Sequence, residues 1–271
     1  MKNTIQVTIE IDNESVREEL IAQLSTIQFD AFEEKEAQLE AFISEEQFDT
    51  ERLAEMLLPY NVIYKNNVIR EQNWNALWES SFQPVVVENF CAVRAPFHEP
   101  VQDVVHEMVI MPKMSFGTGH HATTWMMMAQ MQHIDFAGKR VFDFGTGTGI
   151  LAILAEKLGA ERVVAIDNDE WSIENGKENA ERNGCSKIGL YFASSVPDQQ
   201  FDIVLANINR NVILMHLQYL VPAVIPQGLI LFSGLLNDDE ADIVTACSGE
   251  GLQLLRQQSR NNWISLLFQR V

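Results

Sequence analysis

The sequence predicts an α/β protein with two unequal domains, a small α+β domain and a larger domain built on an open, mostly parallel sheet. Residues 141–169 read as a strand, a glycine-rich turn, a helix and a second strand, which is half of a doubly wound sheet. Residues 3–69 read as β-α-β-β-α-β, the split pattern of a ferredoxin-like domain. The chain has 271 residues, enough for two domains with a substantial buried core.

The small domain is expected over residues 1–69. Its first strand, residues 3–11, alternates polar and apolar side chains as a half-buried strand does. Apolar residues recur at helical spacing in two later segments. The expected helices are residues 15–27 and 49–58, and the further strands are residues 29–34, 38–43 and 61–69.

Residues 70–83 are predicted to form a linker helix, because four large apolar side chains recur there at helical spacing. These residues are Trp74, Leu77, Trp78 and Phe82. Packing in a core is one interpretation of them, and steering of the small domain relative to the large one is the other. The larger domain is expected over residues 84–271, with short strands at residues 85–88 and 90–94 on its flank.

The glycine turn of the larger domain indicates the class of its cofactor. Gly145, Gly147 and Gly149 lie two residues apart, whereas a dinucleotide fingerprint requires a third glycine at the position of Ile150. The pattern is instead D-x-G-x-G-x-G, beginning at Asp143 on the strand. It resembles the S-adenosylmethionine site of class I methyltransferases.

That resemblance implies roles for the residues around the turn. Asp143 would lie near the amino group of the cofactor, and glycines such as Gly145 and Gly147 let the backbone approach the ligand. Asp167, at the end of the next strand, is placed for two hydrogen bonds to the ribose hydroxyls. A glycine-rich turn can also serve only to join a strand to a helix, but an acidic residue on each side of it favours the cofactor site.

The rest of the larger domain completes the sheet. Asn207 emerges at the carboxyl end of the buried strand 201–206, beside the glycine turn, where open α/β sheets bind ligands. A terminal hairpin is expected of a methyltransferase sheet and not of a dehydrogenase. The remaining expected strands are residues 188–192, 228–233, 252–258 and 263–269, and the helices are residues 150–158, 171–183, 211–220 and 239–247.

Residues 109–124 form a second informative stretch. Residues 116–119 read as a flexible loop next to the cofactor edge, and Thr123 or Thr124 is expected to cap the helix that follows. No G-K-[ST] follows the glycines, which excludes a phosphate-binding P-loop. His120 and His121 lack a third partner at ligand spacing, so no metal site is predicted.

Composition excludes several classes of protein. A net charge of −19 argues against a protein that grips a phosphate backbone, and a basic partner fits better. The three cysteines are far apart and odd in number, which suggests neither disulfides nor zinc and favours a reducing cytoplasm. The amino terminus lacks the apolar core of a signal peptide, and polar residues and prolines interrupt the most apolar window, residues 212–232. We expect a cytoplasmic monomer that binds neither membrane nor nucleic acid.

Further motifs extend the likeness to one family. The chain carries W-x3-W-x3-F-x-P from Trp74 and F-G-T-G-x-H-x-T-T from Phe116, followed by DFGTGTGILAI, LGAxxVxAID, ANIN and LFSGLL. Over residues 70–271 it therefore resembles the bacterial ribosomal protein L11 methyltransferases. The resemblance implies methyl transfer from S-adenosylmethionine to amino groups of that ribosomal protein, with the first domain and the linker recognising the substrate.

The resemblance also implies which residues act. Thr124, Gly145, Asp167 and Asn207 would contact the cofactor, and the loop of Phe116 and residues 117–119 would close over its methionine part. The loop residues concerned are Gly117, Thr118 and Gly119. Asn207 and Phe116 are the predicted catalytic residues. The segment Met111-Pro112-Lys113-Met114-Ser115 departs from the family pattern before the loop.

Elementary chemistry constrains the mechanism. A lysine amine has a pKa of about 10.4, so freeing its lone pair at pH 7 costs roughly 4 to 5 kcal/mol, against about 1 kcal/mol for an α-amine. We expect Asn207 and the adjoining backbone carbonyl to hold the amine through its N–H groups, with proximity supplying most of the rate.

Three other functions compete with this interpretation of the sequence. A nucleic-acid methyltransferase would carry Asn/Asp-Pro-Pro-aromatic where this chain has Asn207-Ile208-Asn209. A small-molecule methyltransferase remains open because the glycine turn is common to the class, although the separate first domain favours a protein substrate. A cofactor-binding module without turnover is the third alternative, and nothing in the motifs indicates a lost site.

Overall fold

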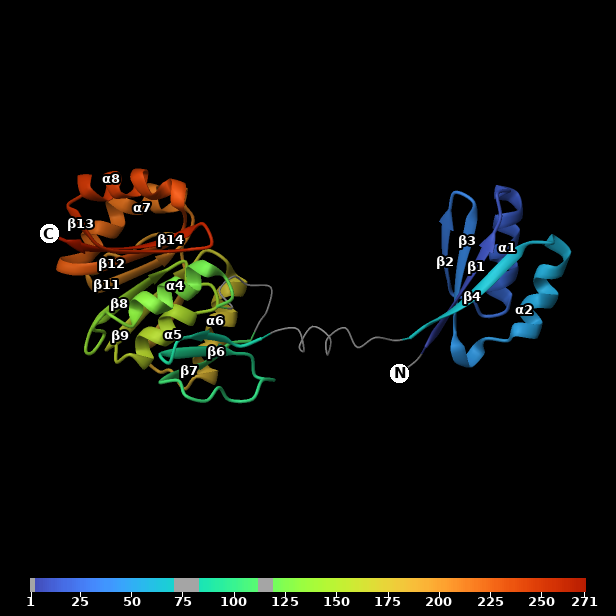
Figure 1. Ribbon diagram of the computed structural model, residues 1–271, viewed down its shortest axis with the longest axis horizontal. Helices are drawn as coiled ribbons and strands as arrows, with labels where there is room; N and C mark the ends of the chain where they lie inside the picture. Colours follow the sequence, from blue (N-terminus) through green and yellow to red (C-terminus); the bar gives the residue numbers. More distant parts are fainter. Residues whose placement is uncertain (1–2, 71–82, 112–118) are drawn as a thin grey trace. The chain divides into compact units, whose positions relative to one another are not determined.

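The computed structural model describes residues 3–70, 83–111 and 119–271. The chain divides into two compact units, Met1–Ser81 and Phe82–Val271 (Figure 1). The predicted linker helix lies almost entirely outside the described residues, as do Phe116, Gly117 and Thr118.

The first unit has the predicted order of elements around one antiparallel sheet. Its strands lie in the order β2-β3-β1-β4, and both helices pack on the same face of the sheet over a single apolar core. Asn13 and Asp49 cap the two helices, because their side chains accept backbone N–H groups of the first turn. The elements are β1 Thr4–Glu10, α1 Glu14–Thr26, β2 Ala31–Lys35, β3 Gln38–Ser44, α2 Thr50–Leu57 and β4 Ile63–Ile69.

The second unit is built on a seven-stranded sheet in the order β10-β9-β8-β11-β12-β14-β13. The first five of these strands are parallel, and β14 runs antiparallel to both of its neighbours, so the terminal hairpin is present as predicted. The strands are β8 Arg140–Phe144, β9 Arg162–Asp167, β10 Ile188–Phe192, β11 Phe201–Asn207, β12 Val224–Leu236, β13 Leu252–Arg260 and β14 Trp263–Arg270.

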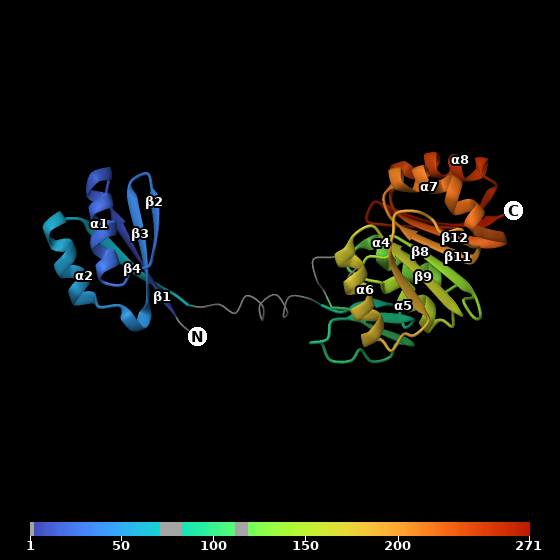
Figure 2. The ribbon, with the colours of Figure 1, turned by 180° about the vertical axis from the view of Figure 1, so that it is seen from behind.

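Helices cover both faces of this sheet, as Figures 1 and 2 show from opposite sides. One apolar core joins the sheet to α4 Ala122–Met131, α5 Ile150–Lys157 and α6 Glu170–Arg182. The other core joins it to α7 Arg210–Ala223 and α8 Glu240–Gly249. The central strands β8, β9 and β11 are apolar along most of their length because both of their faces are buried, which leaves polar residues to gather at their ends.

A three-stranded sheet, β5-β6-β7, accounts for the flanking strands expected before the glycine turn. It consists of β5 Val85–Val87, β6 Cys91–Arg94 and β7 His106–Val109. Residues of β5, β6 and β7 pack into the same core as α4 and α5. β7 ends at Val109, two residues before Met111.

One expectation about α4 was wrong. The helix is capped by His121, whose side chain accepts the N–H of Thr123, whereas Thr123 and Thr124 lie inside the first turn. A histidine ring can accept a hydrogen bond at the position where threonine commonly does so. Thr124 is consequently buried, and its hydroxyl is available to the sheet.

Candidate cofactor site

The predicted site residues gather at one edge of the seven-stranded sheet. β8 lies between β9 and β11, and all three strands are parallel. Their carboxyl ends therefore meet at a single edge, where the chain places Asp143, Asp167 and Asn207. This edge is where open α/β sheets bind their ligands.

The turn after β8 has a backbone that favours glycine. Gly145, Gly147 and Gly149 have φ angles of 76°, 55° and 79°. The N–H groups of Gly145 and Thr146 both donate to the carbonyl oxygen of Ile166, each at 2.9 Å, so the turn is tied to β9. A Cβ on Gly145 would lie 2.5 Å from Cγ2 of Ile208. The turn is thus held close to the segment that follows Asn207, with no room for a side chain.

Asp143 is a buried carboxyl group beneath this turn. It is 1% exposed, and the Thr146 hydroxyl donates to its Oδ2 at 2.6 Å. Its Oδ1 has no hydrogen-bond partner in the part of the chain that the structure describes. Burial, together with the nearby charge of Asp167, raises the pKa of Asp143 to about 7. A cationic group placed near this carboxyl would reverse that shift by favouring its ionised form.

Asp167 links the turn to the start of α6. Its Oδ2 accepts the N–H of Gly147 at 2.9 Å, and its Oδ1 accepts the N–H of Asp169 at 3.0 Å. Asp169 in turn caps α6 by accepting the N–H of Trp171. Each carboxylate oxygen has a second lone pair, so Asp167 can accept two further hydrogen bonds from a diol while it holds the turn.

Asn207 and Thr124 come together although 83 residues separate them. Asn207 is the last residue of β11, and its Nδ2 donates to Oγ1 of Thr124 at 3.2 Å. This contact uses the amide nitrogen and leaves the carbonyl oxygen Oδ1 as a hydrogen-bond acceptor. The pairing explains why both residues belong to one site.

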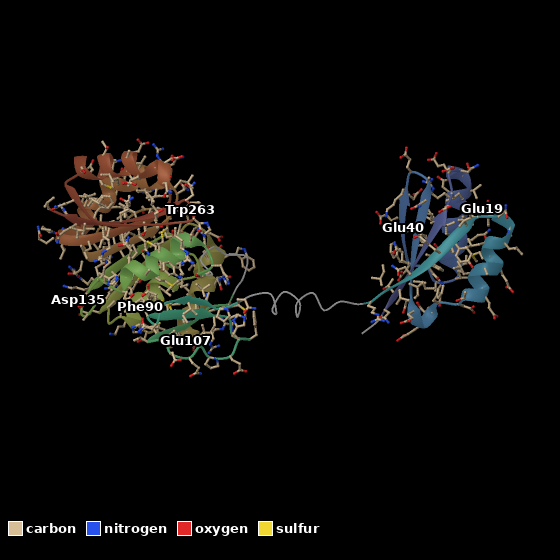
Figure 3. The ribbon with its side chains drawn as sticks, in the orientation of Figure 1. Glu19, Glu40, Phe90, Glu107, Asp135 and Trp263 are labelled. Atoms are coloured by element: carbon tan, nitrogen blue, oxygen red, sulfur yellow. The ribbon has the colours of Figure 1, made fainter. Side chains whose placement is uncertain are left out.

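The terminal hairpin holds the helix that carries Thr124. The rings of His121 and Trp263 are 4.6 Å apart at 72°, and the Arg260 guanidinium lies 4.0 Å from the centre of the Trp125 ring (Trp263 is labelled in Figure 3). Farther along the helix, Gln130 donates to Oγ of Ser265 at 2.8 Å inside the core. The start of α4 is therefore fixed against β13 and β14.

These residues fit the cofactor that the sequence predicted. Asp143 offers a buried oxygen without a partner, Asp167 offers acceptors for a diol, and the glycines provide backbone without side chains. Gly119 is also described: it is buried, has a φ of 89°, and lies against Val93 and Val85. Phe116, Gly117 and Thr118 lie outside the described residues, so the loop prediction remains a prediction.

Two residues at this edge were missed from the sequence. Thr146 occupies an x position of the glycine pattern, yet its hydroxyl is the donor to Asp143. Asn179, on α6, binds the carbonyl of Thr148 in the same turn. A signal for Asn179 existed, because Asn175, Asn179 and Asn183 recur at helical spacing, but polar residues on a helix are usually exposed.

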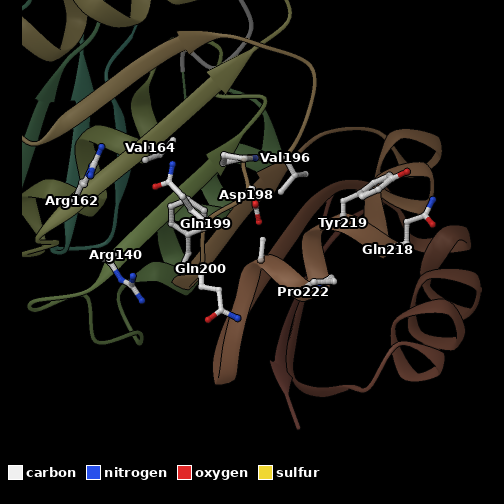
Figure 4. Close-up of a pocket in the computed structure, with 13 residues that line it drawn as sticks. Arg140, Arg162, Val164, Val196, Asp198, Gln199, Gln200, Gln218, Tyr219 and Pro222 are labelled. Atoms are coloured by element: carbon white, nitrogen blue, oxygen red, sulfur yellow. The ribbon is translucent and has the colours of Figure 1, made fainter.

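Two cavities lined by described residues lie away from this edge. One of about 840 Å³ is lined by Arg140, Arg162, Tyr219 and the loop 196–200, at the amino ends of the strands (Figure 4). A second, of about 600 Å³, shares Arg140 and Arg162 with it. Neither contains a predicted cofactor residue, and the converging polar groups at the carboxyl edge locate the site better than cavity size does.

The strand order, the terminal antiparallel hairpin and the glycine turn with its flanking acids define a class I methyltransferase. The family model for ribosomal protein L11 methyltransferase matches residues 2–271, and the chain belongs to this family. The expected activity, methylation of ribosomal protein L11, is confirmed with it.

Relatives support this membership along nearly the whole chain. A ribosomal protein L11 methyltransferase of Porphyromonas gingivalis is 40% identical over 269 residues, covering 96% of this chain and 92% of its own. One from Chlorobaculum parvum is 34% identical over 258 residues, covering 88% of this chain and 86% of its own. A crystal structure of a ribosomal protein L11 methylase from Lactobacillus delbrueckii subsp. bulgaricus has a TM-score of 0.65 at 29% identity, covering 70% of this chain and 99% of its own.

Within the described ranges, no group of three or more His, Cys, Asp or Glu side chains could hold a metal ion. No described helix is long and apolar enough to cross a membrane.

Proposed function

We propose that the carboxyl edge of the sheet holds S-adenosylmethionine and methylates amino groups of ribosomal protein L11. The residues assigned to the cofactor are Thr124, Asp143, Gly145, Gly147, Asp167 and Asn207, with the loop of Phe116, Gly117, Thr118 and Gly119. The observation that carries the proposal is the hydrogen bond of Asn207 to Thr124, since it unites two distant motifs at the glycine turn.

Each assigned group has a task that its chemistry suits. The buried carboxyl of Asp143 would face the ammonium group of the cofactor, and Asp167 would accept the hydrogen bonds of the ribose hydroxyls. Gly145 and Gly147 have no side chain, so the backbone of the turn can approach the cofactor closely. When bound, the cofactor supplies an electrophilic methyl group on a sulfonium. Phe116 would exclude water from the reacting groups.

Asn207 would orient the acceptor amine. With Nδ2 held by Thr124, its Oδ1 can accept an N–H of a neutral amine and aim the nitrogen lone pair at the methyl carbon. S-adenosylmethionine would supply the methyl group and retain the C–S bonding pair on its sulfur, while the amine nitrogen oriented by Asn207 would gain the methyl group and then release a proton to water. Neither step needs a metal or an oxidant, and orientation supplies most of the rate.

The experiment is to measure methyl transfer to purified L11 by Asn207→Ala and by Asn211→Ala, an exposed asparagine four residues away. We expect kcat to fall about 100-fold for Asn207→Ala, as loss of orientation can cost, and to stay unchanged for Asn211→Ala. Cofactor affinity is measured for both by titration calorimetry. Unchanged turnover of Asn207→Ala with intact cofactor affinity would reject the role of Asn207.

We propose further that the first unit recognises the substrate through charge. Residues 1–69 contain 15 Asp and Glu against five Lys and Arg, and Glu33, Glu34 and Glu36 are exposed around the β2–β3 turn. A ribosomal protein that binds RNA needs a basic surface, which such an acidic surface attracts.

Charge reversal tests this recognition. The double variant Glu33→Lys and Glu36→Lys should raise KM for L11 about fivefold at low salt and leave kcat unchanged. Its matched control, Glu161→Lys with Asp198→Lys, reverses two exposed acids of the second unit and should leave KM unchanged. Equal effects of the two pairs would mean that net charge, and not the first unit, attracts the substrate.

The remaining parts of the proposal concern the state of the protein. We propose a cytoplasmic monomer that works without binding nucleic acid. Sedimentation of the purified protein at assay concentration, with and without ribosomal RNA, tests this. A dimer or a complex with RNA would contradict it.

A further inference from the structure

A row of asparagines on α6 and at its C-cap faces the edge of β7 and the glycine turn. Asn175, Asn179 and Asn183 are four residues apart, so they recur every 6.0 Å or so along one face of the helix. Alternate residues of an extended chain recur about every 6.6 Å. The two spacings match closely enough for successive asparagines to bind alternate backbone groups of a strand.

The contacts follow this match. The side chain of Asn183 accepts the N–H of Val109 at 3.0 Å and donates to its carbonyl at 2.8 Å. One turn earlier, Oδ1 of Asn179 accepts the N–H of Met111 at 3.0 Å. Among the described residues β7 pairs with β6 alone, so the two amides take the place of a neighbouring strand at its other edge.

Asn179 makes two contacts that Asn183 does not make. Its Nδ2 donates to the carbonyl of Thr148, in the glycine turn, at 3.0 Å, and lies 3.4 Å from Oδ1 of Asn175. Asn179 is fully buried, so these hydrogen bonds are shielded from water. A single amide therefore joins Met111, the last described residue before the Phe116 motif, to the glycine turn.

The helix that carries this amide begins at the other end of the same site. Asp167 binds Gly147 and Asp169 ahead of α6, and Asn179 binds Thr148 from its third turn. The glycine turn is thus held on both sides by the segment 167–179. Asn183, by contrast, contacts β7 and the backbone of α6.

We propose that Asn179 is a positioning residue for cofactor binding, which fixes the glycine turn relative to the backbone of Met111. The inference rests on the proposal that this turn holds S-adenosylmethionine. Asn183 has a purely structural role, because it anchors β7 through two similar hydrogen bonds without contacting the turn. A comparison of Asn179 variants with Asn183 variants therefore separates an effect on cofactor binding from an effect on thermal stability.

The test measures cofactor affinity and thermal stability for Asn179→Ala, Asn179→Asp, Asn183→Ala and Asp167→Ala. Affinity is measured by calorimetric titration with S-adenosylhomocysteine, and KM and kcat are measured with L11. We expect both alanine variants of the row to lower Tm by similar amounts. Asn179→Ala should in addition weaken cofactor binding about tenfold, which corresponds to about 1.4 kcal/mol, with Asn183→Ala within twofold of the parent.

Asn179→Asp keeps the acceptor for Met111 and loses the donor to Thr148. We expect it to weaken cofactor binding as much as Asn179→Ala does, since the contact with the turn is the one that matters. Unchanged affinity in both Asn179 variants would overturn the inference, and so would an equal loss in Asn183→Ala. Asp167→Ala tells this failure from that of the proposed site: if it too binds normally, the turn does not hold the cofactor.

Discussion

The two edges of the seven-stranded sheet differ in what they offer a ligand. The amino edge has the cavity of about 840 Å³, with Arg140 and Arg162 side by side in register on β8 and β9. The carboxyl edge has Asp143, Asp167 and Asn207, each held by a hydrogen bond from or to another part of the site. The carboxyl ends of parallel strands lie at the same edge of a sheet. Polar side chains that converge at that edge therefore locate the reactive site better than a cavity does.

The largest effect should come from Asp167, the acid that the site uses twice. Asp167→Ala removes the acceptors for Gly147 and Asp169 as well as those proposed for the ribose. Because hydrogen bonds to a charged group contribute about 1.5 to 3 kcal/mol each, we expect cofactor affinity to fall at least about 100-fold. Calorimetric titration with S-adenosylhomocysteine measures this.

A matched substitution at the amino edge sharpens the result. Asp202 accepts the N–H of Arg140 at 2.8 Å, much as Asp167 accepts that of Gly147. Asp202→Ala should therefore destabilise the fold without changing cofactor affinity. A similar loss of affinity in both variants would show that the two edges do not differ as we infer.

The next largest effect is expected from alanine substitution of one of two glycines that both have a left-handed backbone. Gly145 has a φ of 76° and Gly138, in the turn before β8, a φ of 68°. An added Cβ would meet Ile208 at 2.5 Å at position 145 and nothing within 4 Å at position 138. Both alanine variants carry a backbone cost of about 1 to 2 kcal/mol, but only Gly145→Ala also displaces its neighbour.

We expect Gly145→Ala to raise KM for S-adenosylmethionine about tenfold, since the turn and Ile208 must move apart at the site. Gly138→Ala should lower Tm and leave KM unchanged. Steady-state kinetics and thermal unfolding of the two variants distinguish the backbone strain, which both share, from the clash with Ile208, which only Gly145→Ala has. If Gly145→Ala bound the cofactor normally, the close approach of Ile208 would have no part in the site.

The sequence predicted the elements of both units and most of this edge because the signals are local. Glycine spacing, alternation along Thr4–Glu10 and the apolar runs of β8 and β9 each act within a few residues. The prediction that Thr123 or Thr124 caps α4 was wrong because histidine and threonine side chains compete for the same backbone N–H groups. The Asn207–Thr124 contact and the contact of Asn179 with Met111 join segments tens of residues apart, which no local pattern contains.

A smaller effect is expected in the pH dependence of stability, which should differ between the buried Asp143 and the exposed Asp198. Burial and the charge of Asp167 raise the pKa of Asp143 from 3.8 to about 7. Between about pH 4 and 7 the unfolded chain loses this proton while the folded protein keeps it, so the contribution of Asp143 to stability falls as pH rises through that window. Asp143→Asn removes this loss of stability because its amide does not ionise.

We expect the Tm of Asp143→Asn, relative to the parent, to rise by about 3 °C or more between pH 5 and pH 8 in the absence of cofactor. Asp198→Asn, at an exposed acid of the amino-edge cavity, should show no such change. Circular dichroism melts at both pH values give the comparison. A constant difference for Asp143→Asn would mean that its carboxyl titrates as an exposed one does.

The smallest effect is expected at the amino edge itself. Arg162 is exposed and lines both cavities there, so Arg162→Gln removes a charge from the hollow while keeping much of the side chain. Because no group of the proposed reaction lies at this edge, kcat, KM for the cofactor and KM for L11 should all stay within about twofold, as is usual for surface substitutions of this kind. A loss of cofactor affinity would place a ligand among the amino ends of the strands. A rise in KM for L11 alone would instead extend the substrate surface to this edge, and the contrast between the edges would then be one of cofactor against substrate.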